Sequence, residues 1–192
     1  MFIYTHGNAV DIGHLADRRA YFESQKIAVC LVEYPGYGVS GGKATPSQGY
    51  AAMDAAYTYV EEQVDGQIPI IVYGRSLGSG LAMYAASRYP CAGVIFESGY
   101  RSAQRVLLPV RLFPWDYFDS QSLLTEVTAP ILFIHGEQDR VVPFSHGVYM
   151  AAHAQNCFGH CWLADTGHND IYLSRPQVHQ QLQKFLLSLA PE

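Results

Sequence analysis

The chain has 192 residues, of which 49% are hydrophobic and 15% charged, and its formal net charge is −5. This length and composition suit one globular domain with a substantial core and exclude a disordered chain. The modest acidic charge argues against a nucleic-acid partner or an anionic membrane, because both select a clustered basic face. Basic pairs such as Arg18 with Arg19 are scattered, and we expect them on solvated helix faces.

The N-terminal third of the chain alternates strand and helix patterns. An apolar strand is predicted over 2–5, and Ile12, Leu15 and Phe22 then have the spacing of one helical face. A second strand over 27–32 leads into a loop that is rich in glycine and proline.

The next helix has a well-marked start. Thr45 can cap it, Pro46 suits the first helical position, and Gln48 can reach back as in a capping box. We expect this helix to bury an apolar face and to end at Gly66.

An apolar run over 68–73 then enters the motif Gly74-Arg75-Ser76-Leu77-Gly78, and a helical pattern of small residues follows to about Arg88. This order predicts a strand, a sharp turn and a helix, with Ser76 at the apex and its hydroxyl held clear of the sheet. The two glycines suit so tight a turn because a side chain there would collide across it. The alternative is an ordinary turn whose serine merely caps the helix.

The rest of the chain continues the alternation, and we find no internal repeat or interdomain linker. The predicted elements are strands over 92–96, 130–134 and 157–163, a helix over 144–155 and a final helix from about 174. Strands that alternate with helices indicate a mostly parallel sheet with helices on both faces, in a single α/β domain over 1–192.

Residues 98–128 interrupt this rhythm with an aromatic, proline-studded stretch that has no clean period. We expect a short cap-like excursion, which is either a flap over the core or one wall of a substrate pocket. The candidate substrate-binding residues are Tyr34, Tyr100, Leu112 and Trp115, and further apolar candidates for the wall are Leu107, Phe113 and Phe118.

The cysteines favour neither a disulfide framework nor a metal site. Cys157 and Cys161 flank His160, but the second Cys/His pair of a structural zinc site is missing, so a short strand is the preferred interpretation. No signal peptide or membrane-length apolar stretch is visible, and we expect a cytoplasmic protein without cofactor or metal.

Four loops follow predicted strands, and they carry Asn8, Ser76, Asp139 and His168. In a parallel sheet such loops gather at one edge, where ligands bind. Ser76 is the candidate nucleophile, His168 the base that activates it, and Asp139 the acid that orients the histidine. Glu137 is the rival acid, but Asp139 lies deeper in its loop. The backbone N–H groups of Leu77 and Asn8 are the candidate oxyanion-hole donors.

The chain has eight histidines, so the base has to be chosen among several candidates. His6 and His135 each precede a glycine at a strand end, where we expect the ring to brace the loop by hydrogen bonds. His168 instead lies between Gly167 and Asn169 in a loop that can reach over the sheet to Ser76.

These motifs resemble the α/β-hydrolases, and most closely the serine hydrolases of the Bem46-like and ABHD17-like branch, with related peptidase S33 signatures. The resemblance covers essentially the whole chain, and its segments are 6–9, 34–40, 74–78, 135–139, 144–147 and 167–170. It implies hydrolysis of carboxylic esters or thioesters, including palmitoyl groups on protein cysteines, with Ser76, Asp139 and His168 as the triad.

The chain also departs from this family. It starts at the strand that enters His6-Gly7-Asn8, without the antiparallel strands that usually precede it, and it has Glu33 where the family often has Asp. We therefore expect the 27–32 strand at a sheet edge, which is paired in a homodimer or covered by the 34–42 loop.

The sequence thus predicts a serine esterase for small-molecule esters with short to medium acyl chains. The alternatives are a thioesterase for acyl-proteins or small molecules, an aminopeptidase and a non-catalytic binding protein with a hydrolase fold. An aminopeptidase would want an acidic anchor for the substrate's amine, and no such cluster stands out.

Overall fold

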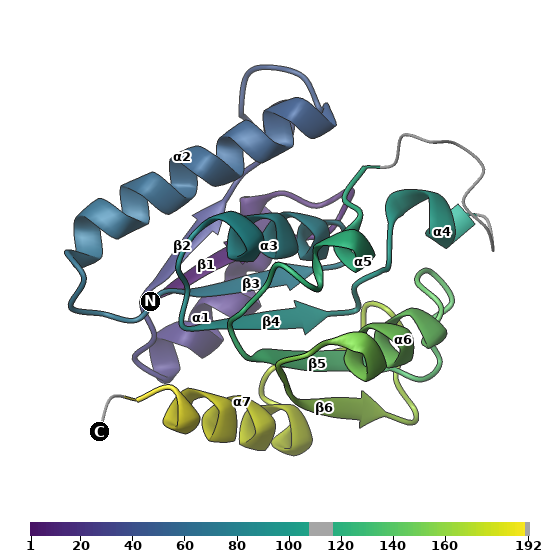
Figure 1. Ribbon diagram of the computed structural model, residues 1–192. Helices are drawn as coiled ribbons and strands as arrows, with labels where there is room; N and C mark the ends of the chain where they lie inside the picture. The colour runs from purple at the N-terminus through teal and green to yellow at the C-terminus, as the bar shows by residue number, and fades with distance from the viewer. Residues whose placement is uncertain (108–116, 191–192) are drawn as a thin grey trace.

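The computed structural model describes residues 1–107 and 117–190 and contains a six-stranded sheet in the order β2-β1-β3-β4-β5-β6 (Figure 1). All the strand pairings are parallel. The strands are β1 (Phe2–Thr5), β2 (Val29–Val32), β3 (Ile71–Arg75), β4 (Gly93–Glu97), β5 (Ile131–Gly136) and β6 (Cys157–Leu163). The predicted parallel α/β sheet is confirmed.

Helices cover both faces of this sheet. The longer ones are α1 (Ala16–Ser24), α2 (Pro46–Val64), α3 (Leu77–Arg88), α6 (Ser145–His153) and α7 (Pro176–Ser188). Helices α1 and α7 cover one face, and α2, α3 and α6 cover the other (Figure 1). Phe22 of α1 and Phe185 of α7 pack in the core on the first face, and residues of α2, α3 and α6 pack in the core on the second. Two hydrophobic cores result, one on each side of the sheet.

Strand β3 lies between β1 and β4, and four of its five residues are buried. Because side chains alternate along a strand, Ile71 and Tyr73 enter one core and Val72 enters the other. An apolar run without polar alternation is what a strand covered on both faces requires. The turn that carries Ser76 is therefore anchored near the middle of the molecule.

Strand β2 lies at the edge of the sheet, as expected for the 27–32 segment. It pairs with β1, and three of its four residues are only partly buried. Whether a second copy of the chain or the 34–42 loop covers its free edge stays a prediction.

Two local expectations were wrong in detail. The 12–24 segment begins as a 3-10 helix (η1, Ile12–Leu15) and not as a continuous α-helix. Ile12 is 41% exposed and does not share a buried face with Leu15 and Phe22. At the start of α2, Thr45 caps the helix as predicted, but the Gln48 side chain accepts a hydrogen bond from the backbone N–H of Lys43, so no capping box forms.

The 98–128 excursion contains two short helices that its sequence did not indicate, α4 (Ala103–Leu107) and α5 (Ser120–Leu123). Phe118 packs its ring against Tyr50 of α2, and its backbone N–H donates to the hydroxyl of that tyrosine. The excursion thus covers α2 and α3 near Ser76. Leu112, Phe113 and Trp115 lie outside the described residues, and so does the side chain of Leu107.

The four cysteines are free thiols, and Cys157 is exposed while Cys161 is buried. His160 stacks on Trp162 with ring centroids 4.6 Å apart. Within the ranges that the structure describes, no three His, Cys, Asp or Glu side chains group to hold a metal ion, and no helix is long and apolar enough to span a bilayer.

Candidate active site

The turn after β3 has the sharp geometry that its sequence predicts. Ser76 has φ 53° and ψ −117°, and its backbone N–H donates to the carbonyl of Glu97 on β4. A Cβ at Gly74 would lie 2.4 Å from the carbonyl oxygen of Gly78, and one at Gly78 would lie 2.2 Å from that of Thr5. Only glycine fits these contacts. The Ser76 side chain makes no capping hydrogen bond to α3, which contradicts the alternative of a simple capping serine.

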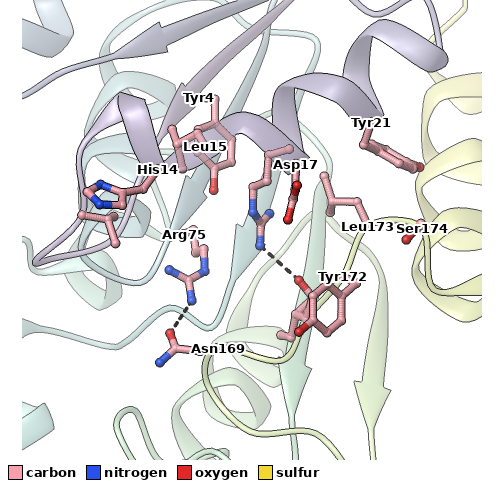
Figure 2. A pocket seen from close by; sticks show the side chains of 13 residues that line it. Tyr4, His14, Leu15, Asp17, Tyr21, Arg75, Asn169, Tyr172, Leu173 and Ser174 are labelled. Atoms are coloured by element: carbon pink, nitrogen blue, oxygen red, sulfur yellow. Dashed lines mark hydrogen bonds between the residues drawn. The ribbon is translucent and has the colours of Figure 1, made fainter.

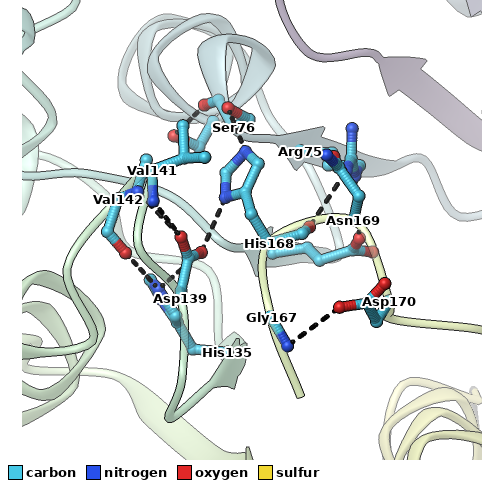
Figure 3. A network of polar contacts seen from close by, with 12 residues as sticks. Arg75, Ser76, His135, Asp139, Val141, Val142, Gly167, His168, Asn169 and Asp170 are labelled. Carbon is cyan, nitrogen blue, oxygen red and sulfur yellow. Dashed lines mark hydrogen bonds and ion pairs between the residues drawn. The ribbon is translucent and has the colours of Figure 1, made fainter.

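Three residues from separate loops meet above the sheet (Figure 3). The Ser76 Oγ lies 3.0 Å from Nε2 of His168, and Nδ1 of His168 lies 2.6 Å from Oδ2 of Asp139. Because the carboxylate can only accept, we assign the imidazole proton to Nδ1, which leaves Nε2 free to accept from the hydroxyl. The structure therefore brings the three predicted residues together as a hydrogen-bonded relay.

Asp139 is held from several sides. Its Oδ1 accepts hydrogen bonds from the backbone N–H groups of Val141 and Val142, and its Oδ2 lies 3.3 Å from Nε2 of His135. Burial would raise the pKa of this carboxyl, but the hydrogen bonds from His135, His168 and Val142 outweigh it and lower the pKa well below its usual value. Asp139 is therefore ionised, whereas its rival Glu137 is exposed to solvent.

The two candidate oxyanion-hole donors border one cavity. Leu77 is the first residue of α3, so its N–H has no partner inside the helix. Asn8 follows His6-Gly7 after β1, and its Oδ1 accepts a hydrogen bond from the hydroxyl of Tyr37. Leu77 and Asn8 both line a cavity of about 250 Å³. Their role toward an oxyanion stays a prediction.

His6 and His135 brace their loops as expected. Nε2 of His6 lies 2.9 Å from Glu33, and the other carboxylate oxygen of Glu33 accepts from the backbone N–H of Ile12. The hydroxyl of Tyr34 donates to the His6 carbonyl at 2.6 Å, and His135 donates to the carbonyl of Val142 at 3.0 Å. Glu33, a departure from the family pattern, therefore ties the loop that carries Asn8 to the start of η1.

The 250 Å³ cavity is mostly apolar and lies on the α2 and α3 side of the sheet. Tyr34, a predicted substrate-binding residue, and Phe118, a predicted wall residue, both border it. Tyr100 is buried but is not among the described residues that border this cavity. Further lining residues that we did not predict are Pro35, Tyr37, Ala44, Thr45, Pro46, Gly49 and Leu81. No local signal marks them, because they come from a loop and two helices.

A second cavity, of about 270 Å³, lies on the α1 and α7 side of the sheet (Figure 2). Arg75 and Asn169 border it together with Arg18, which is only 14% exposed because it forms an ion pair with the buried Glu97. The expectation that Arg18 lies on a solvated helix face was therefore wrong, although its neighbour Arg19 is 63% exposed. The strands β3 and β4 each end in a charged residue, Arg75 and Glu97, and this was the signal that could have revealed the network.

The family model described as serine aminopeptidase, S33, matches residues 1–113, more than half of the chain. The chain belongs to this α/β-hydrolase family. Alpha/beta hydrolase domain-containing protein 17C of Mus musculus is 36% identical over 189 residues, which cover 96% of the chain and 58% of the relative. Protein 17B of Homo sapiens is 33% identical over 96% of the chain and 65% of its own length. The resemblance to the ABHD17-like branch is confirmed, and the chain spans less than two thirds of these curated relatives.

Solved structures share the fold at low sequence identity. An esterase of Pyrococcus furiosus has a TM-score of 0.80 at 14% identity, covering 99% of this chain and 82% of its own. The monoacylglycerol lipase of Paleococcus ferrophilus has a TM-score of 0.73 at 16% identity, covering 98% and 94%. Likenesses at this identity carry the fold alone and assign no chemistry to the site of this chain.

Proposed function

We propose that this protein is a serine hydrolase that cleaves carboxylic esters with short to medium acyl chains through an acyl-enzyme on Ser76. One observation carries the proposal. The relay of Ser76, His168 and Asp139 has contacts of 3.0 and 2.6 Å, and Leu77, which directly follows Ser76, borders a mostly apolar cavity together with Asn8.

Acylation begins when the Ser76 Oγ attacks the acyl carbon and its proton passes to Nε2 of His168. The imidazolium that forms is stabilised by the ionised Asp139, which accepts from Nδ1. The oxyanion that develops accepts hydrogen bonds from the backbone N–H groups of Leu77 and Asn8, and each such donor contributes about 3 kcal/mol. The intermediate collapses when His168 returns the proton to the leaving alcohol.

Deacylation repeats these steps with water in place of serine. His168 takes a proton from a water molecule, the resulting hydroxide attacks the acyl carbon, and the carboxylic acid leaves as Ser76 regains its proton. No step needs a metal or an organic cofactor. The histidine serves as base and acid in turn, so its place between Ser76 and Asp139 is the geometric requirement.

The size and lining of the cavity support short to medium acyl chains. Its volume of about 250 Å³ lies below the roughly 300–1,000 Å³ of sites for drug-sized ligands. Each methylene that is buried there contributes about 0.8 kcal/mol until the cavity is full. Longer chains then extend into water and add nothing.

The cavity also favours an ester over a peptide. The described residues that border it include no Asp or Glu, so the free α-amino group of an aminopeptidase substrate would lack a carboxylate partner there. A thioesterase would use the same relay. Comparing kcat/KM for an oxygen ester and a thioester of the same acyl chain distinguishes these two activities.

The test combines a covalent probe with a panel of p-nitrophenyl esters of graded chain length. A fluorophosphonate should label Ser76, and Ser76→Ala should lose both labelling and hydrolysis with an unchanged circular dichroism spectrum. Activity should peak at short to medium chains. Labelling that survives in Ser76→Ala contradicts the nucleophile, and activity that rises steadily to palmitoyl esters contradicts the pocket. A wild-type protein that neither reacts nor hydrolyses would support the non-catalytic alternative.

A further inference from the structure

A buried carboxylate that the proposed reaction does not use lies at the end of β4. Glu97 has no exposed surface, and its two oxygens accept from Arg18 at 2.5 and 2.7 Å. Nε of Arg75 lies 3.3 Å from Oε1 of Glu97, and the hydroxyl of Tyr73 donates to Oε2. Burial alone would raise the pKa of Glu97, but the two guanidinium groups reverse this and lower it, so the carboxyl is ionised.

Both arginines also donate hydrogen bonds to the loop that carries His168. Nη2 of Arg75 donates to the backbone carbonyl of His168 at 3.0 Å and to Oδ1 of Asn169 at 2.7 Å (Figure 3). Nη2 of Arg18 donates to the carbonyl of Ile171 at 3.3 Å. The loop is thus held at two points by guanidinium groups that also contact one carboxylate.

The same residue also holds the nucleophile. The backbone carbonyl of Glu97 accepts from the N–H of Ser76 at 2.9 Å, and Arg75 directly precedes Ser76 in the chain. Glu97 is therefore linked to both members of the Ser76–His168 pair. Its backbone carbonyl binds Ser76, and its carboxylate contacts Arg75, which in turn binds the loop of His168.

We propose that Glu97, Arg75 and Arg18 are positioning residues that hold the His168 loop at hydrogen-bond distance from Ser76. The proposal rests on the proposed function, because it assigns these residues to the same relay. It goes beyond the triad by naming the group that fixes the distance between the base and the nucleophile.

Two physical arguments favour positioning over a purely stabilising role. A buried ion pair adds little net stability, because desolvation offsets most of the Coulomb energy. The planar guanidinium of Arg75, in contrast, presents donors in a fixed fork, which sets the direction of the His168 carbonyl as well as its distance. A displacement of about 1 Å in a catalytic group can cost roughly 100-fold in rate.

The test compares Arg75→Lys with the same substitution at the exposed Arg19. Lysine keeps the charge next to Glu97 but cannot form the fork. In Arg75→Lys we expect kcat for the best ester to fall about 30- to 100-fold, as for a misplaced catalytic group, with KM within about threefold. Arg19→Lys should behave as the wild type in both kcat and melting temperature.

A second readout needs no substrate. The proton on Nδ1 of His168, bonded to Asp139 at 2.6 Å, should give a downfield proton resonance that is assigned by its loss in His168→Gln. In Arg75→Lys this resonance should broaden or move upfield, while it stays in place in Arg19→Lys. If the wild type hydrolyses no ester, the proposed function fails, but this resonance still tests the positioning.

The proposal is overturned if Arg75→Lys keeps kcat within twofold of the wild type, or if its His168 resonance is unchanged. Asn169→Ala covers the case in which Arg75→Lys does not fold, since it removes only one acceptor of Arg75 on the exposed side of the loop. A smaller fall in kcat, about three- to tenfold, together with a broadened resonance is then expected. Wild-type values of both in Asn169→Ala would reject the proposal in that case.

Discussion

Two buried carboxylates follow neighbouring strands of the sheet, and their partners differ in kind. Asp139 comes after β5 and is surrounded by backbone N–H groups and the two histidines His135 and His168. Glu97 ends β4 and is surrounded by the permanent cations Arg18 and Arg75. In both carboxyls the hydrogen-bonding partners overcome burial and lower the pKa.

On the proposed mechanism, the difference separates a group that takes part in the chemistry from one that holds the geometry. Asp139 faces a histidine that can gain a proton, so its attraction to that partner grows as the reaction proceeds. Glu97 faces guanidinium groups, which carry a permanent charge, so the proton transfers of the proposed mechanism leave the charge of its partners unchanged. Variants of each carboxylate and of its surroundings should separate these two roles.

Asp139→Asn should lower kcat by about four orders of magnitude, because the amide favours the wrong tautomer of His168 and cannot stabilise its charged form. Steady-state kinetics on the best p-nitrophenyl ester measure the loss. Glu137→Gln, an exposed change in the same loop, is the matched control and should retain wild-type kcat. A loss of less than tenfold in Asp139→Asn would contradict its assignment as the carboxylate that orients His168.

Glu97→Gln should act on stability as well as rate. The amide leaves the charges of Arg18 and Arg75 without a counterion, which costs about 3–5 kcal/mol in the free energy of unfolding. For a chain of this length the melting temperature should fall by about 6–20 °C. Scanning calorimetry measures it against Glu62→Gln, an exposed change on α2. Equal melting temperatures for the two variants would show that Glu97 is not a buried counterion.

Acid should weaken the Asp139 side of the molecule before the Glu97 side. His146, at the start of α6, lies near His135, and burial together with the charge of Arg101 lowers its pKa to about 4. The unfolded chain therefore binds this proton more readily than the native protein. The stabilisation is complete above pH 6.5 and is lost progressively between pH 6.5 and 4, by up to about 3 kcal/mol.

His146→Gln should flatten this dependence, because a glutamine side chain does not titrate. Its amide oxygen can still accept the hydrogen bond from the backbone N–H of Arg101. Urea unfolding at pH 7.5, 6.0 and 5.0 compares the two proteins. Glu97, whose folded pKa is lowered, loses its stabilising contribution only as the pH falls below about 4.5. Identical pH profiles for wild type and His146→Gln would refute the assignment of this acid sensitivity to His146.

A substitution in the cavity wall should change the acyl-chain preference without affecting Asp139 or Glu97. A Cβ at Gly49 would lie 3.8 Å from both Leu81 and Phe118, which is ordinary contact, so Gly49→Ala should fold normally. The added methyl occupies the space of about one methylene, which is worth about 0.8 kcal/mol. The ratio of kcat/KM for the longest accepted acyl chain to that for acetyl should fall about fourfold. An unchanged ratio would place the acyl chain elsewhere.

The local sequence determined the parts of this protein that depend on neighbouring residues. The apolar run before Gly74 and the glycines on either side of Ser76 specify a buried strand and a tight turn, because no other residue fits those contacts. The order of Ser76, Asp139 and His168 at strand ends then predicts the relay, since parallel strands present their carboxyl ends at one edge.

The tertiary structure alone decided which polar residues are buried and what surrounds the relay. Arg18 has the sequence pattern of an exposed helix residue, yet only 14% of its side chain is exposed, and Glu97, 79 positions away, supplies its counterion. The cavity likewise joins Asn8, Gly49 and Phe118 from distant parts of the chain. Burial of a charge and the shape of a cavity depend on groups that meet only after folding, so no local pattern records them.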